Sequence, residues 1–220
     1  MMTRKIKHII TTVLIIAAAT ACSNDEYVYP SVITEFTEIC TNAKGELEHI
    51  HTDKNERYTI EHREGLDGLV PDSTYRAMTI YAHTDNPNIV SLYTAQLAIA
   101  PIPVPHTAFK EGIKTDPLDI QSIWYTHRYI NMILVPMMKD KGHLFHFVDN
   151  GITLENDGTQ ILDITLYHDR ANDYEAFKKE VYLSVPIYHY ADKLHDNDKI
   201  RININTYQKG YITKEYTYKH

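Results

Sequence analysis

Apolar and polar residues alternate along the first half of the chain, in short segments separated by turn residues. In the longest segment Tyr75, Ala77 and Tyr81 fall on one face and Met78 on the other, which is the period-2 pattern of a strand. Closing such strands into a barrel removes exposed sheet edges, so we expect a small closed barrel over residues 31–100. Its five predicted strands span residues 32–40, 46–52, 58–62, 74–84 and 90–100.

The second half, residues 118–220, carries the same alternation: Leu162, Ile164 and Leu166 face one way and the residues between them face the other. Strands at this regular spacing predict an antiparallel β-sandwich. Pro186 cannot donate to a sheet ladder, so we expect its strand at an edge or a bulge. The predicted strands span residues 120–125, 129–135, 143–148, 161–168, 181–190, 200–205 and 211–218, and residues 174–179 predict one or two helical turns.

Between the two halves lie Pro101, Pro103 and Pro105, and this segment ends at Asp116-Pro117. Proline stiffens the backbone toward an extended form and interrupts sheet pairing. We therefore predict that residues 101–117 link two domains. The length of the chain suits either one large domain or two small ones.

The N-terminus has the features of a secretory signal. Three basic residues precede an apolar run over residues 9–19, which is too short to cross a bilayer. Ala19-Thr20-Ala21-Cys22 resembles a bacterial lipobox, although that pattern usually has Leu in the place of Ala19. The resemblance implies that residues 1–21 are removed and that Cys22 is acylated. The alternative is an ordinary signal peptide with a chance cysteine.

Residues 22–30 are predicted to form an acidic tether. Asp25 and Glu26 resemble the surface-export signal of Bacteroidota lipoproteins, and a solvated tether is the alternative interpretation. Several acyl chains on Cys22 would give durable attachment to a membrane. We therefore expect a lipid-anchored protein of the outer membrane, which the export signal would place at the cell surface.

The charge balance argues against nucleic acid as a partner. Without residues 1–21 the chain keeps 19 Lys and Arg against 29 Asp and Glu, a net charge of −10. Residues 31–105 alone hold five basic residues against eleven acidic ones. Because phosphate binding needs a basic face, we expect no nucleic-acid partner.

Cysteine usage points to hydrophobic cores instead of disulfides. With Cys22 acylated, Cys40 has no intramolecular partner. Cys40 lies in a predicted strand beside Ile39, and a reactive cysteine requires a nearby positive charge. We interpret it as a buried free cysteine.

The histidines offer a weak case for a metal site. His49 and His51 share one face of a predicted strand, as a pair of metal ligands would. His143 and His146 would not share a face, and no Cys, Asp or Glu completes a tetrahedral set by its spacing. We interpret these residues as exposed strand histidines. The motifs of hydrolases, zinc proteases and nucleotide-binding enzymes are absent from the sequence, so we predict no catalytic residue and no cofactor.

Three aromatic residues near the start of the second domain invite comparison with glycan-binding surfaces. Trp124, Tyr125 and Tyr129 could stack on a saccharide ring if they were exposed. A single tryptophan on a sandwich strand is more often part of the core. We favour a core position for Trp124 and leave the tyrosines open.

Most of the chain after the lipobox resembles the NigD-like lipoproteins of Bacteroidales. The residues that carry the resemblance are TYRAMTIYAHT, VSLYTAQLAIAPI, EGIKTDPLDIQSIWYTHRYINMILVP, ILDITLYHDRANDYE and KIRININTY. The resemblance implies an N-terminal five-stranded OB-type barrel and a C-terminal β-sandwich. It also implies a link to bacteriocin immunity, and it supplies no catalytic residues.

The leading hypothesis is a lipid-anchored, non-enzymatic envelope protein that acts by protein–protein contact and is immunity-like by resemblance. A glycan-binding accessory lipoprotein is the first alternative, and an exposed aromatic platform would favour it. A metal-dependent hydrolase that uses His49 and His51 is the second.

Overall fold

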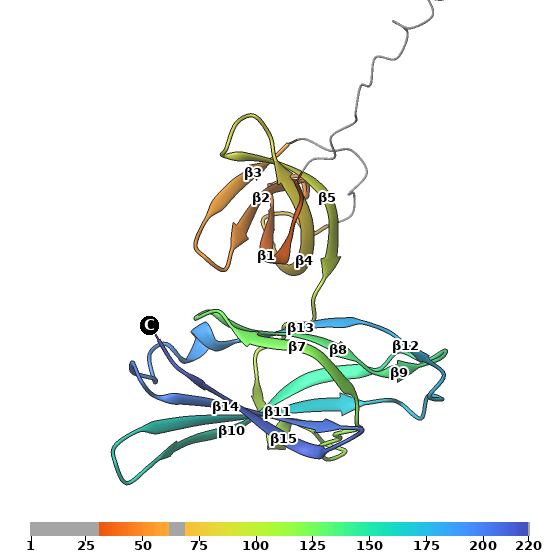
Figure 1. Cartoon of the computed structure of the whole chain (residues 1–220), viewed down its shortest axis with the longest axis vertical. Coiled ribbons are helices and arrows are strands. Elements are labelled where there is room, and N and C mark those ends of the chain that lie inside the picture. The colour runs from red at the N-terminus through yellow and green to blue at the C-terminus, as the bar shows by residue number, and fades with distance from the viewer. Residues whose placement is uncertain (1–30, 62–68, 220) are drawn as a thin grey trace, which may run out of the picture. The chain divides into compact units, whose positions relative to one another are not determined.

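The computed structural model describes residues 31–61 and 69–219, so Cys22, Asp25 and Glu26 lie outside the described residues. Val32–His220 form one structural unit. A closed five-stranded barrel comes first, and a β-sandwich follows it along the chain (Figure 1). The predicted all-β fold, a barrel followed by a sandwich, is therefore confirmed.

The barrel closes because β1 pairs with both β2 and β4, while β3 pairs in parallel with β5. Its core is made of inward-facing apolar residues such as Ile39, Ile50 and Val90. β4 is buried on both faces, because Tyr81 points into this core and Arg76 meets the sandwich on the other side. The barrel strands are β1 (Ile33–Thr41), β2 (Leu47–Thr52), β3 (Arg57–Ile60), β4 (Thr74–His83) and β5 (Ile89–Leu97).

The sandwich packs a five-stranded sheet, in the order β15-β14-β11-β10-β6, against a three-stranded sheet in the order β13-β8-β7. Leu162, Ile164 and Leu166 of β11 all enter the shared core, as their alternation in the sequence predicted. The strands are β6 (Val104–Pro105), β7 (Asp119–Tyr125), β8 (Tyr129–Val135), β10 (Leu144–Leu154), β11 (Gln160–Asp169), β13 (Val181–Pro186), β14 (Lys199–Thr206) and β15 (Gly210–Thr217).

Two pairs of neighbouring strands in the larger sheet run parallel, β6 with β10 and β11 with β14. The sheet is therefore mixed, whereas the sequence predicted an antiparallel sandwich. For β11 and β14 the reason is the path of the chain. After β11 the chain crosses to the other sheet as β13 before it returns as β14, and parallel strands need a crossover connection of this kind.

The segment predicted as a linker contributes to the sandwich. β6 pairs with β10, and Thr115 forms an isolated bridge with His168. A short 3₁₀-helix, η1 (His106–Ala108), follows β6 directly. The alternating prolines thus lie where the chain enters the sandwich, and β6 is at the edge of its sheet, where a missing N–H is tolerated.

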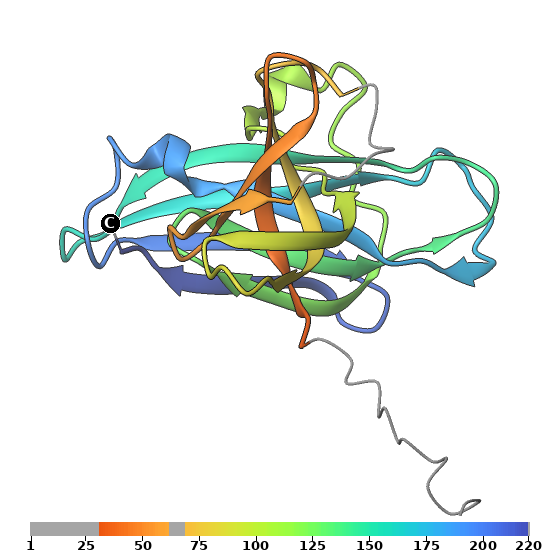
Figure 2. The same ribbon diagram turned by 90° about the horizontal axis from the view of Figure 1, so that it is seen from above.

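The helical turns predicted for residues 174–179 do not form. Phe177–Lys178 is instead a strand, β12, which pairs with β9 (Met137–Met138) in a two-stranded ribbon (Figure 2). The prediction was wrong because this pairing joins segments that are far apart in the sequence. The strand predicted for residues 181–190 ends at Pro186, on the edge strand β13, and continues as the 3₁₀-helix η2 (Ile187–Tyr190). Within the described residues, no helix is long and apolar enough to span a membrane.

Candidate functional site at the barrel–sandwich junction

A buried arginine joins the barrel to the sandwich. Arg76, on β4, is only 7% exposed. Its guanidinium donates two hydrogen bonds to Asp53, each 2.6 Å long, one to Asn131 at 2.9 Å and one to Ser184 at 3.2 Å. Asp53 belongs to the barrel, whereas Asn131 and Ser184 belong to the sandwich strands β8 and β13. One side chain therefore ties together both domains.

The partner groups of Arg76 are themselves satisfied. Asp53 also accepts hydrogen bonds of 2.8 Å from Thr126 and from the side-chain amide of Asn131. Ser184 donates to the Asn131 carbonyl oxygen at 2.7 Å. Buried charges are stable in proteins only when they are paired and hydrogen-bonded. We call Arg76, Asp53, Asn131, Ser184 and Thr126 the junction network.

Strand register explains why these sandwich residues meet the barrel. Ser184 lies opposite Asn131, and Asn131 lies opposite Trp124, so the three residues form one row across β13, β8 and β7. Neighbouring residues of β8, such as Ile130 and Met132, point into the sandwich core. The row therefore lies on the other face of the sheet, where it contacts the barrel.

Aromatic rings surround the buried guanidinium. The Arg76 Cζ atom lies 3.8 Å from the centroid of the Tyr129 ring and 5.5 Å from that of Phe36. Phe36 in turn makes an edge-to-face contact with Trp124, with 5.6 Å between the ring centroids. Cation–π contacts stabilise a desolvated guanidinium without adding another charge.

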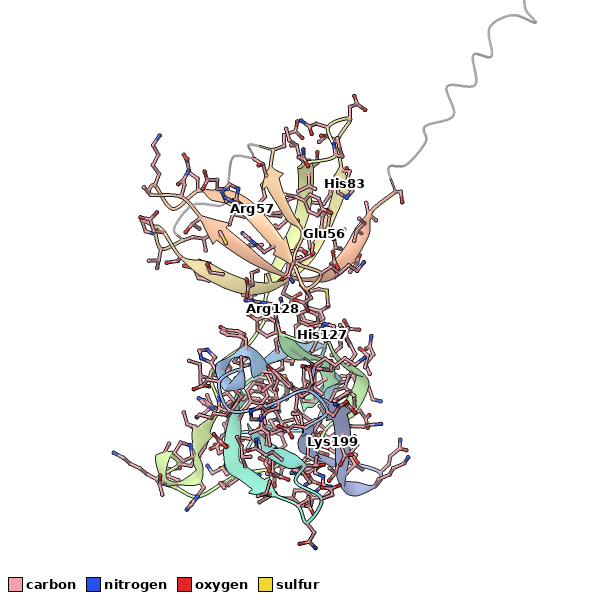
Figure 3. The ribbon with its side chains drawn as sticks, turned by 90° about the vertical axis from the view of Figure 1, so that its left-hand side faces the viewer. Glu56, Arg57, His83, His127, Arg128 and Lys199 are labelled. Atoms are coloured by element: carbon pink, nitrogen blue, oxygen red, sulfur yellow. The ribbon has the colours of Figure 1, made fainter. Side chains whose placement is uncertain are left out.

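A second ion pair crosses the junction. Glu38, on β1, accepts hydrogen bonds from the Tyr129 hydroxyl at 2.5 Å and from Arg128 at 2.9 Å. Burial alone would raise the pKa of Glu38, but these two hydrogen bonds and the charges of Arg128 and Arg76 together outweigh it and hold the pKa below its ordinary value. Burial and the Glu38 carboxylate raise the pKa of Tyr129. Arg128 and His127 are marked at the junction in Figure 3.

A cleft of about 490 Å³ opens beside the junction network. Its wall includes Phe36, Trp124, Asp53 and Lys54. Trp124 is half-buried and outside the hydrophobic core clusters, so the predicted core position was wrong. The prediction failed because the outer face of β7 is covered by the barrel, not by the second sheet. We call this hollow the junction cleft.

The other two candidate aromatics do not form an open platform with Trp124. Tyr129 is buried beneath the barrel and bound to Glu38. Tyr125 is half-buried, and its hydroxyl donates to the backbone oxygen of His127. Of the three aromatics, Trp124 alone lines the cleft.

His49 and His51 lie on β2 and are both half-buried, which differs from the predicted exposure. His49 Nε2 is 3.1 Å from a carboxylate oxygen of Glu48, and burial together with Arg57 lowers the pKa of His51. In the described part of the chain, no three His, Cys, Asp or Glu side chains are grouped to hold a metal ion.

Cys40 is half-buried, with its sulfur 3.5 Å from the Thr74 hydroxyl, whereas the sequence predicted full burial. It lies in β1 near the barrel rim. There the alternation of β1 turns its side chain away from the core that holds Ile39.

A second buried polar group lies in the sandwich, and it was not predicted from the sequence. His143 Nδ1 lies 2.8 Å from His168 Nε2, and His168 Nδ1 lies 2.8 Å from the backbone oxygen of Asp116. His143 Nε2 is 3.6 Å from Asp173, and both side chains are almost fully buried. Burial lowers the pKa of both histidines. We call His143, His168 and Asp173 the histidine cluster.

Sequence reasoning also missed the junction network. Its signal was the presence of Asn131 inside the apolar run YINMILV and of Ser184 inside VYLSVP. A polar residue within a buried strand has to find a hydrogen-bond partner. Such residues therefore indicate that a second surface covers the strand.

Comparison with known proteins places the sandwich in a family. Residues 100–219 match the model of the NigD-like C-terminal beta sandwich domain. A NigD-like immunity protein from Bacteroides caccae is 29% identical, with a TM-score of 0.71 over 87% of this chain and 99% of that one. No curated protein matches the chain.

Two more distant structures share the fold. A candidate toxin-related protein from Parabacteroides distasonis is 12% identical, with a TM-score of 0.66 over 86% of this chain and 93% of that one. A candidate lipoprotein from Bacteroides fragilis is also 12% identical, with a TM-score of 0.61 over 86% of this chain and 99% of that one.

Proposed function

Because the chain belongs to the NigD-like family, we propose that it is a lipid-anchored, non-enzymatic protein of the cell envelope that acts by contacting another protein, as an immunity protein does. Cys22 would carry the acyl chains, and Asp25 and Glu26 would direct the protein to the cell surface. The similarity to the immunity protein from Bacteroides caccae supports this role.

The junction network is the observation that carries the proposal. The two oxygens of Asp53 receive hydrogen bonds from Arg76, Thr126 and Asn131, so this carboxylate is fully engaged within the protein. A barrel fixed to a sandwich in this way offers one preorganised surface. Such a surface favours binding, because no domain has to be ordered when the partner arrives.

Survival of cells tests the immunity role. We expect a strain without the gene to be killed by neighbouring bacteriocin-producing strains and to survive when the wild-type gene is restored. The Cys22→Ser variant should fail to restore survival, because it cannot be acylated. Cys40→Ser is the matched control, since it removes a cysteine that no lipid would occupy. Unchanged survival of the deletion strain would overturn the immunity role.

The location can be measured separately. The wild-type protein should enter the detergent-soluble membrane fraction and be cleaved by protease added to intact cells. Replacement of Asp25 and Glu26 by Ala should protect the protein from that protease while it stays in the membrane fraction. Recovery of the wild-type protein in the cytosol with residues 1–21 still attached would contradict the anchor.

Glycan binding is the second candidate, and the half-buried indole of Trp124 in the junction cleft favours it. Because Trp124 is the single tryptophan of the chain, its fluorescence reports directly on this cleft. A cell-surface oligosaccharide that quenches this fluorescence, and does not bind the Trp124→Ala variant, would support this candidate. Unchanged fluorescence across a panel of such glycans would exclude it.

A further inference from the structure

A groove lies between the two sheets of the sandwich, where each sheet ends in an edge strand. β7 is the last strand of the three-stranded sheet, and β15 is the last strand of the five-stranded sheet (Figure 1). The groove between them has a volume of about 710 Å³. Both strands pair on one side only among the described strands, so each offers backbone N–H and C=O groups on its other side.

The groove has an apolar floor. Ile120 and Ile123 of β7 and Ile212 of β15 line it. All three are half-buried and pack against the core of the sandwich. A bound chain could therefore bury apolar side chains here as well as pair through its backbone.

The rim of the groove is basic, although the whole chain is acidic with a net charge of −7. Of the described residues that line the groove, Lys178, Lys209 and Lys214 are basic and Asp119 alone is acidic. Lys178 forms an ion pair with Asp119 at 3.0 Å. Among the described residues, no ion pair engages Lys209 or Lys214, and both are exposed. We call this feature the lysine groove.

We propose that the lysine groove binds an extended acidic segment of a partner protein, which adds to the sandwich as a strand beside β15. This inference rests on the proposed function, because it specifies the contact through which the protein would engage its partner. Addition of a strand to a free sheet edge uses backbone hydrogen bonds for affinity and side chains for specificity.

We place the bound strand beside β15 and not beside β7, because the edge of β15 is the more regular of the two. β15 pairs with β14 from Gly210 to Thr217 without a register shift. β7 instead has an irregularity between Ile120 and Ser122 in its pairing with β8. A regular edge presents its N–H and C=O groups at the spacing that an incoming strand needs, whereas a bulge disrupts that spacing.

The charges select an acidic occupant. Lysines on an edge strand discourage pairing with other strands. A neutral strand would bury the lysine charges without a partner, and a basic strand would be repelled by them. Carboxylates on the incoming strand would instead meet Lys209 and Lys214. Charge complementarity of this kind gives specificity and speeds association at low salt.

A peptide-binding experiment tests the proposal. The mature chain, residues 22–220 with Cys22→Ser, is titrated into a short fluorescein-labelled peptide in which Glu alternates with Val, and anisotropy is recorded. We expect binding that is about tenfold or more tighter than for the same peptide with Lys in place of Glu, and that weakens as salt is added. Methylation of alternate peptide nitrogens should abolish it, because it removes backbone donors.

Variants locate the site. Lys209→Glu/Lys214→Glu should weaken binding of the acidic peptide by about tenfold or more. Lys44→Glu/Lys110→Glu is the matched control, with the same change of charge at exposed sites outside the groove, and should bind almost as the wild type does. Equal binding of acidic and basic peptides, or equal losses in the two double variants, would overturn the proposal.

The outcome is distinguishable from a failure of the proposed function. If the mature chain binds no acidic peptide while the gene still protects cells, the lysine groove is wrong and the immunity role stands. If the peptide binds through Lys209 and Lys214 while deletion of the gene leaves survival unchanged, the groove stands and the immunity role fails.

Discussion

The junction network and the histidine cluster are both buried and polar, but they differ in how completely their groups are paired. In the junction network, the guanidinium of Arg76 and the carboxylate of Asp53 bond to each other and to neutral partners. In the histidine cluster, His143 Nε2 finds no hydrogen-bond partner among the described residues. The two groups therefore behave differently. The junction network holds the barrel and the sandwich together, whereas the stability of the histidine cluster depends on its protonation.

The difference follows from the order of donors and acceptors in the histidine cluster. His168 Nδ1 faces a carbonyl oxygen, so it must donate, and its Nε2 must then accept from His143 Nδ1. Neutral His143 is left with a bare Nε2 that faces the Asp173 carboxylate at 3.6 Å. A proton there would complete the chain of hydrogen bonds, but burial opposes the charge and lowers the pKa of His143.

The largest expected effect is at the junction network. Arg76→Met should lower the free energy of unfolding by about 3–5 kcal/mol, because it leaves the Asp53 carboxylate, whose side chain is only 11% exposed, without a cation. Arg201→Met is the matched control: Arg201 pairs with Glu215 at 2.9 Å on the surface, where such a pair contributes below about 1 kcal/mol. Urea unfolding followed by Trp124 fluorescence measures both.

A double variant sharpens this test. Arg76→Met combined with Asp53→Asn removes the orphaned charge as well as the guanidinium. We expect its loss of stability to be smaller than the sum of the two single losses, which is the signature of a direct interaction. Strict additivity would show that the two side chains do not depend on each other.

A smaller effect is expected at the second ion pair of the junction. Tyr129→Phe removes the hydrogen bond to Glu38, and a hydrogen bond to a charged group contributes about 1.5–3 kcal/mol. The folded state lowers the pKa of Glu38 from its ordinary value of 4.5. The carboxylate therefore stabilises the fold above that pH and loses its effect as the pH falls through the lowered pKa.

The cost of Tyr129→Phe should accordingly be largest at neutral pH and shrink toward strongly acidic pH. Urea unfolding at several pH values measures it. Tyr182→Phe is the matched control, because the Tyr182 hydroxyl donates to Glu180 at 2.9 Å in an exposed position. If the loss of unfolding free energy in Tyr129→Phe did not change with pH, the Tyr129 hydroxyl would not be what stabilises the charged form of Glu38.

The local sequence pattern was sufficient to predict both domains, because the alternation of apolar and polar residues marks the strands and the turn residues mark their ends. It could not place Trp124, since the barrel that covers it belongs to a distant part of the sequence. The same limit explains β12: residues 174–179 lack a clear strand pattern, and pairing with Met137–Met138 decides their conformation. Tertiary contacts override local preference at such positions.

The candidate sites were less predictable than the fold. His49 and His51 were visible because they lie two residues apart. His143, which directly precedes β10, meets His168 only because β10 pairs with β11. Asn131 could have been noticed as a polar residue in an apolar run, but its partner Arg76 lies 55 residues away. Sequence spacing reveals side chains that share one strand, but it does not reveal side chains that are brought together by the pairing of distant strands.

The smallest expected effect is a pH dependence at the histidine cluster. Burial lowers the pKa of His168 below the ordinary value of 6.5. On acidification the unfolded chain takes up this proton first, so the free energy of unfolding should fall as the pH drops below about 6.5, by at most ~1.4 kcal/mol per pH unit for one proton. His168→Gln should reduce this slope, as measured by urea unfolding between neutral and mildly acidic pH.

Phe145→Leu is the matched control, because it removes the ring stacked on His168 but no titrating group. It should lower the free energy of unfolding at every pH and leave the slope against pH unchanged. Equal slopes in the wild type and His168→Gln would show that the cluster takes no part in the pH response, and its contrast with the junction network would then be one of geometry alone.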